Sequence, residues 1–176
     1  PYYQSSTQYL YGYQPTTLSY PKDQILQRFN TVGIELGLQN KLVNTFGTTY
    51  HPQISLTGFS DNHENQEMNL IIRAPINKSF GKIYAIDLDM GADISATTAP
   101  VVPNYPDIKN NLFYINPSLQ FKTPNLKLNA GIRPSWDNQS FSNLPNITVE
   151  AKVSEVGLVL EAGWIGYYQK NTLRSL

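Results

Sequence analysis

The chain has 176 residues, of which 15% are charged, and its basic and acidic residues balance to a formal net charge of zero. Soluble domains carry roughly 25% charged residues, and a neutral chain gives no electrostatic reason to expect nucleic acid as a partner. Cysteine is absent, which excludes disulfides, thiolate metal sites and cysteine nucleophiles. No apolar run reaches the roughly 20 residues that a membrane-spanning helix needs.

Residues 1–27 precede the first clear pattern in the chain. Within Gln8–Gln14, the side chains of Tyr9, Tyr11 and Tyr13 would share one side of an extended segment. We therefore expect residues 1–27 to form an external loop or the end of a preceding strand.

From residue 28 onward, apolar and polar residues alternate with the period of two that marks β-strands. The alternation defines eight runs, over residues 28–40, 46–58, 67–77, 84–95, 113–121, 126–137, 147–153 and 158–169. Each run has all or nearly all of the roughly 9–11 tilted residues with which a strand crosses a bilayer. The pattern predicts an all-β chain, with about eight antiparallel strands forming a meander in a transmembrane β-barrel over residues 28–170. Residues 171–176 would begin a loop or a further strand.

One side of the runs is apolar and has no Asp, Glu, Lys or Arg away from the run ends. We expect this side to contact lipid, because a soluble barrel would instead show water a face rich in Lys and Glu. The predicted lipid-facing residues are Val32, Ile34, Leu36, Leu56, Leu70, Ile72, Ile86, Leu88, Phe113, Leu128, Val149 and Leu160. Aromatic residues near the run ends are typical of membrane interfaces. They are Tyr50, Tyr84, Phe121, Trp136, Trp164 and Tyr168.

The other side of the runs holds most of the interior charge, together with many Gly, Ser, Thr, Asn and Gln residues. The lumen of a barrel accepts such residues and lets opposite charges pair. The charged or titratable residues predicted to line this lumen are Glu35, His51, Arg73, Asp87, Asp89, Asp93, Lys127, Arg133, Glu150, Lys152 and Glu161.

The connections between the runs are predicted to alternate in length. Short turns are expected near residues 41–45, 79–81, 123–125 and 154–157, and long polar loops at 59–66, 97–110 and 137–146. Outer-membrane barrels have short periplasmic turns and longer external loops. Prolines inside the predicted strands argue against the barrel prediction, because proline cannot donate to a β-ladder. These prolines are Pro52, Pro75, Pro117 and Pro134.

With this alternation, the first and last predicted strands both have their free ends on the long-loop side. Complete bacterial barrels normally bring both termini to the short-turn side, so we expect the chain to be part of a larger barrel. A small complete barrel of eight strands is the alternative.

Three carboxylates, Asp87, Asp89 and Asp93, alternate along one run and so share its polar side. Carboxylates of this kind could hold Ca²⁺, which needs six to eight oxygen ligands. The favoured interpretation is an acidic stripe paired with a basic neighbour, with Arg73 opposite or next to Asp87.

The other candidate chemistry is weak. The two histidines, His51 and His63, show no convergent metal ligands in the sequence. Glu150, Lys152 and Glu161 on facing runs could act as an acid and base, but they lack a nucleophile and an oxyanion device, so a salt-bridge network is favoured. We expect no catalytic residue, metal or cofactor.

Two segments, 130–137 (AGIRPSWD) and 162–171 (AGWIGYYQKN), resemble barrel strands of Bacteroidota outer-membrane proteins, which are grouped with the TonB-dependent-receptor-like barrels. The resemblance covers roughly the last fifty residues and is one of strand texture. It implies a barrel fold and a place in the outer membrane of a Gram-negative bacterium.

Three functions remain open at this point. The first is a pore or transporter barrel. The second is a structural or assembly subunit that docks other outer-membrane proteins and has no transport role. The third is a soluble ligand-binding β-barrel with its apolar side chains inside.

Overall fold

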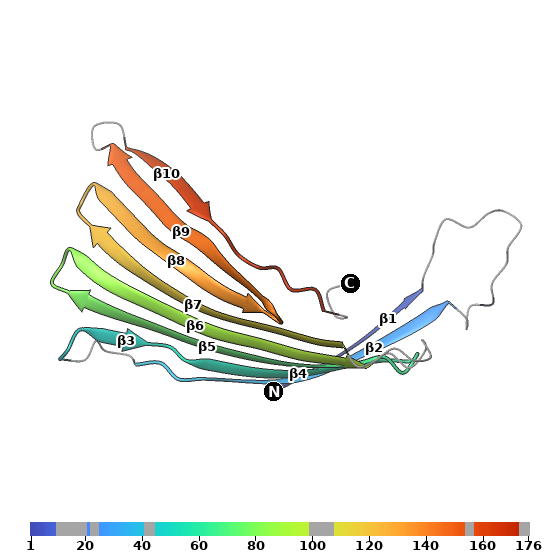
Figure 1. The fold of residues 1–176 in the computed structure, drawn as a ribbon. Coiled ribbons are helices and arrows are strands. Elements are labelled where there is room, and N and C mark those ends of the chain that lie inside the picture. Colours follow the sequence, from blue (N-terminus) through green and yellow to red (C-terminus); the bar gives the residue numbers. More distant parts are fainter. Residues whose placement is uncertain (10–20, 22–24, 41–44, 99–107, 154–156, 173–176) are drawn as a thin grey trace, which may run out of the picture.

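A computed structural model describes residues 1–9, 21, 25–40, 45–98, 108–153 and 157–172 of the chain (Figure 1). This part of the chain contains strands and no helix, so no helix long and apolar enough to cross a membrane occurs in it. The ten strands are β1 (Tyr2–Tyr9), β2 (Leu26–Gly37), β3 (Thr48–Tyr50), β4 (Gln53–Asp61), β5 (Gln66–Phe80), β6 (Tyr84–Thr98), β7 (Ile108–Lys122), β8 (Leu126–Asp137), β9 (Ser140–Val153) and β10 (Leu158–Ile165).

All ten strands belong to one antiparallel sheet, in the order β1-β2-β4-β5-β6-β7-β8-β9-β10, and β3 lies off this path and pairs with β5. The predicted all-β, antiparallel meander is therefore confirmed. The sheet is strongly curved and has a hollow side (Figure 1), but it is open: within the described residues β1 pairs only with β2, and β10 pairs only with β9.

The predicted strand over residues 46–58 is present with an interruption. β3 and β4 both pair with β5, and the partners Tyr50↔Ile76 and Gln53↔Arg73 follow a single register. The two strands are thus one line of chain that is broken at His51 and Pro52. A proline in the line explains the break, because it has no N–H for the ladder.

The other prolines are accommodated in different ways. Between β7 and β8, ladder pairs are present at Tyr114↔Ser135 and again at Ser118↔Gly131, with none between them. Pro117 and Pro134 lie in this gap, and each keeps a partner on its other side. A ladder interrupted where both strands carry a proline is the expected consequence of two missing donors.

Two predicted long loops are wrong. The chain reverses between β4 and β5 over residues 62–65, and between β8 and β9 over 138–139 alone. At the first turn the carboxylate of Asp61 accepts from the backbone N–H groups of His63 (2.8 Å) and Asn65 (2.9 Å). At the second, Asn138 adopts a φ of 51°. Asn and Asp favour such turns because they bond the nearby backbone and tolerate positive φ.

The N-terminal segment also differs in detail from the prediction. A strand is present, but it lies at Tyr2–Tyr9 and pairs with β2 along its whole length. Most of the segment 8–14, and the expected connections at 41–45, 97–110 and 154–157, lie wholly or largely outside the described residues.

The sheet does not enclose an apolar core. Among the described residues, the buried hydrophobic side chains are Phe59 and Leu112 alone. Small polar residues are buried instead, with Ser135 only 1% exposed and Ser95 4% exposed. The inward side of the curve is therefore the polar one, and the apolar side faces outward.

Candidate functional site: the two faces of the sheet

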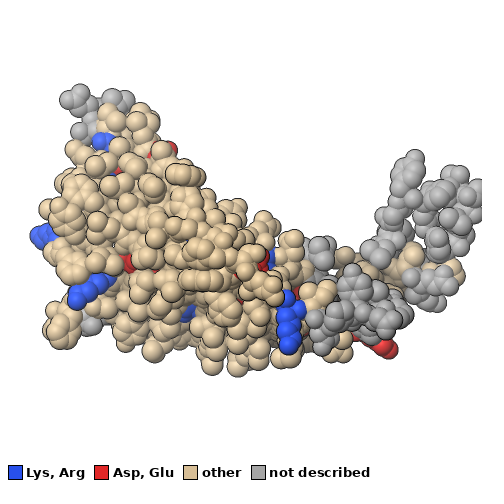
Figure 2. All heavy atoms as spheres, viewed as in Figure 1, with Lys and Arg blue, Asp and Glu red and all other residues tan. Residues whose placement is uncertain are grey.

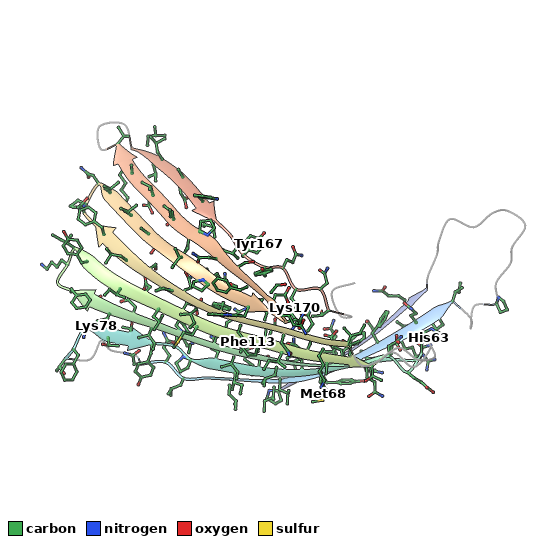
Figure 3. The ribbon with its side chains drawn as sticks, in the orientation of Figure 1. His63, Met68, Lys78, Phe113, Tyr167 and Lys170 are labelled. Atoms are coloured by element: carbon green, nitrogen blue, oxygen red, sulfur yellow. The ribbon has the colours of Figure 1, made fainter. Side chains whose placement is uncertain are left out.

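The outward, convex face carries apolar side chains in register from strand to strand. One row runs Leu36, Ile54, Ile72, Ala92, Phe113, Trp136 and Phe141. Met68 lies on the same face, and Figure 3 shows its side chain below the sheet, away from the hollow. The register places all twelve predicted lipid-facing residues on this face, and several are widely exposed, for example Val32 (59%), Leu36 (61%) and Leu160 (55%).

Aromatic rings mark both ends of this face. At one end Tyr84 and Phe121 have ring centroids 5.4 Å apart, and Phe80 pairs with Tyr84 in the same row. At the other end Trp136 and Phe141 are also 5.4 Å apart. The two rows are separated by eight residues along β5 and β7, which is roughly 27 Å of strand. Strands of outer-membrane barrels are tilted by roughly 35–45°, so this length would correspond to a height of roughly 20 Å, somewhat less than their apolar band of about 25 Å.

Charge is nearly excluded from the band between these two rows. Among the described residues of the band, the register places Lys78 alone of the charged side chains on the convex face. Its ammonium lies 5.5 Å from the centre of the Phe80 ring, toward the end of the strand. A long basic side chain can reach an interface in this way while its stem stays on apolar surface. Most of the surface visible below the sheet in Figure 2 is accordingly uncharged.

The concave face is a hydrogen-bonded polar surface. The carboxylate of Asp93 accepts from Asn69 (2.7 Å) and from the ammonium of Lys170 (2.5 Å). The carboxylate of Asp87 accepts from Asn77 (2.5 Å) and from Gln120. These two carboxylates of the predicted acidic stripe thus each have their own donors.

Asp89, the third carboxylate of the stripe, accepts a hydrogen bond from an aromatic side chain. The Tyr114 hydroxyl donates to Asp89 at 3.3 Å, and the Arg133 guanidinium lies over the Tyr114 ring at 4.0 Å from its centre. Gly91 makes this arrangement possible, because a Cβ there would overlap the Tyr114 ring. Because Gly91 has no side chain, the Tyr114 ring of β7 can pack against β6.

The predicted pairing of Arg73 with Asp87 is wrong. Arg73 lies opposite Gly91, and Asp87 lies opposite Asn77, four residues along the strand from Arg73. The reason is the β5–β6 turn, which closes at Phe80↔Tyr84 and fixes the register of the whole hairpin.

The remaining predicted polar residues also lie on the concave side. The strand registers place four of them on this side: Glu35, Lys127, Lys152 and Glu161. Glu150 also lies there and contacts Lys127 at 4.0 Å. This contact is weak, because the two side chains are 52% and 34% exposed.

The histidines are far apart in the fold. His51 lies at the break between β3 and β4, where its ring contacts the side-chain amide of Gln53 at 3.2 Å. His63 lies in the turn after Asp61. In the part of the chain that the structure describes, no three His, Asp or Glu side chains converge as metal ligands.

The segment after β10 behaves differently from the sequence prediction. The alternation suggested a strand through residue 169 with Tyr168 among the interfacial aromatics, but β10 ends at Ile165. The Tyr168 hydroxyl donates to Ser142 on the concave side at 2.6 Å, and Lys170 reaches Asp93 on β6. Tyr167 and Lys170 lie in the hollow (Figure 3).

This crossing segment brings in a residue that sequence reasoning missed. Lys170 directly follows the last predicted run, yet its side chain is only 7% exposed and it contacts a residue 77 positions earlier. A sequence signal existed: Ile165 places an apolar residue on the polar side, and Gly166 follows it, so the alternation fails there.

The chain was compared with known proteins at three levels. No family model, no curated protein and no solved structure matches it.

Proposed function

We propose that this chain forms part of the wall of an outer-membrane β-barrel in a Gram-negative bacterium, of the pore or transporter type. The observation that supports this most is the convex face. It exposes large apolar side chains in continuous rows, and the described band between its aromatic ends has one charge, Lys78. Exposed apolar surface on this scale marks an interaction with lipid or protein.

The strand lengths support the same proposal. β5, β6 and β7 each have 15 residues, which exceeds the roughly 9–11 that a tilted strand needs to cross a bilayer. A soluble ligand-binding barrel would need the convex side chains packed in an interior, whereas Leu36, Ile72 and Leu160 are each at least 40% exposed. The resemblance of segments 130–137 and 162–171 to Bacteroidota barrel strands agrees with the proposed location.

A second candidate is a structural or assembly subunit without transport. It is favoured by the segment over 166–172, whose Lys170 is held in the hollow by Asp93, because chain lying across a lumen would obstruct passage. The open edges at β1 and β10 would then pair with further strands, of this protein or of a neighbouring outer-membrane protein.

Fractionation and gel mobility test the membrane proposal. Protein expressed with a signal for export should be recovered from the outer membrane only with detergent, and its mobility should change on boiling. Recovery of a folded, monodisperse protein without detergent would contradict the proposal.

Conductance separates the two candidates. The purified protein in planar bilayers should give discrete channels if it forms an open pore. A folded, heat-modifiable protein that gives no channels, and that copurifies with another outer-membrane protein after mild extraction, would favour the assembly role.

A further inference from the structure

A pocket of about 490 Å³ lies between the concave face and the segment that crosses it after β10. β5, β6, β7 and β8 provide one wall, and Tyr167, Tyr168, Gln169 and Lys170 provide the other. The charged residues that line it are Arg73, Asp89, Asp93, Arg133 and Lys170.

The acidic groups of the pocket already have partners. Asp93 holds the Lys170 ammonium and the Asn69 amide, and Asp89 accepts from the Tyr114 hydroxyl. The Asp93–Lys170 pair is largely shielded from solvent on the lysine side, at 7% exposure. Lys170 balances the charge of Asp93, and the three basic and two acidic groups that line the pocket sum to one positive formal charge.

The two guanidinium groups are not paired in this way. Within the described residues, no carboxylate lies within 4.0 Å of Arg73 or Arg133. Arg133 rests on the Tyr114 ring, and Arg73 is on the same face three strands from Arg133, in the row Arg73, Gly91, Tyr114 and Ser135. The pocket is therefore lined by two guanidinium groups that have no carboxylate partner among the described residues.

We propose that this pocket binds a small solute bearing an oxyanion, a carboxylate or a phosphate. Arginine presents donors in a planar fork that matches both groups and forms charge-assisted bonds with them. The exposed Tyr167 supplies a ring surface for the uncharged part of the solute, such as a sugar ring. The inference rests on the proposed function, because it assigns a substrate class to the lumen side of the barrel wall.

Equilibrium binding to the purified full chain in detergent micelles tests the inference without relying on flux. Titration calorimetry would use glucuronate, inorganic phosphate and neutral glucose as probes. We expect glucuronate or phosphate to bind and glucose to bind at least tenfold more weakly. Binding of glucuronate alone assigns a carboxylate solute, and binding of both assigns a general oxyanion site.

Variants locate the binding in the pocket. The double substitution Arg73→Gln with Arg133→Gln should weaken anion binding at least tenfold, and Arg133→Lys should weaken it less. As a control, Arg28→Gln removes one guanidinium charge at an exposed strand end outside the pocket and should leave anion binding unchanged.

Two results would overturn the inference: no anion binding by the wild-type protein, or equal binding by the wild type and the double variant. Boiling-dependent gel mobility is measured on the same samples. If mobility changes but no anion binds, the ligand inference fails alone. If anions bind in the expected pattern but the protein is stable without detergent, the membrane proposal fails and the site remains.

Discussion

The two faces of the same strands are built on opposite principles. On the convex face the side chains are large, apolar and exposed, and ring pairs such as Tyr84–Phe121 and Trp136–Phe141 link neighbouring strands. On the concave face they are small or polar, and amide and carboxylate groups bond across strands. A soluble protein would show the reverse arrangement. The difference between the faces shows that the apolar side chains are not packed into an interior in the described part of the sheet, as the proposed lipid-facing side requires.

The sharpest test places one positive charge on each face at the same height. Ile115 is 41% exposed on the convex face, and Asn116 beside it is concave and accepts a bond from Asn146 at 2.9 Å. In a bilayer, Ile115→Lys should cost about 2–4 kcal/mol of folding free energy, because charge on the lipid face near midplane is destabilising. Asn116→Lys should cost about 1 kcal/mol, from the lost hydrogen bond.

Urea unfolding from lipid vesicles, followed by tryptophan fluorescence, measures both variants. Since Ile115 is exposed, its replacement would cost little if water covered that face. Equal costs for the two variants would therefore contradict a lipid-facing convex side.

The close packing of the concave face can be broken at Gly91. A methyl group there would overlap the Tyr114 ring, so Gly91→Ala should destabilise the fold by about 1–3 kcal/mol. Gly58→Ala is the matched control, because a Cβ there meets Val32 on the convex face at an ordinary 3.5 Å. The same denaturation measurement applies.

A Tyr114→Ala background sharpens this result. Without the ring, Gly91→Ala should cost much less, and the difference between the two backgrounds is the coupling energy. A cost that is the same in both backgrounds would show that Tyr114 does not lie on Gly91.

The crossing segment can be loosened at Tyr168. Tyr168→Phe removes the donor to Ser142 and should cost about 0.5–1.5 kcal/mol if the segment is held on the concave face. Tyr167→Phe serves as the control, because Tyr167 is 68% exposed and its hydroxyl has no hydrogen-bond partner among the described residues. Hydrogen exchange at residues 166–172 should rise only in the Tyr168 variant.

The smallest effect is expected at the exposed pair on the concave face. Lys127→Gln breaks the 4.0 Å contact with Glu150 and should change stability by less than about 1 kcal/mol. The change should shrink further in high salt, because exposed pairs are screened. A loss well above this range at any salt concentration would mean that the pair is shielded in the assembled protein.

Much of the fold could be predicted from alternation alone, and its failures are local. β7 and β9 begin earlier than predicted, because Asn111 and Asn143 place polar residues on the apolar side near the strand ends and interrupt the alternation. The loop predicted at 137–146 was inferred from Asn, Ser and Pro content, yet most of it is strand β9. Polar composition does not distinguish a loop from the polar end of a long strand.

The residues of the concave face could be predicted from the sequence, but their contacts could not. The sequence placed Asp87, Asp89, Asp93 and Arg133 on one face, since side chains two residues apart share a face in any strand. It could not give their partners. These depend on the hairpin register for Asn77 and Gln120, and on the path of the chain after β10 for Lys170.

The sequence by itself determined that the chain forms antiparallel strands with one apolar and one polar side, because a period of two is a local property of the backbone. Only the tertiary structure decided which side is convex, where the turns close and that the segment after β10 returns across the hollow. Those features depend on how neighbouring strands align and twist over the whole sheet, and residues up to 77 positions apart meet as a result.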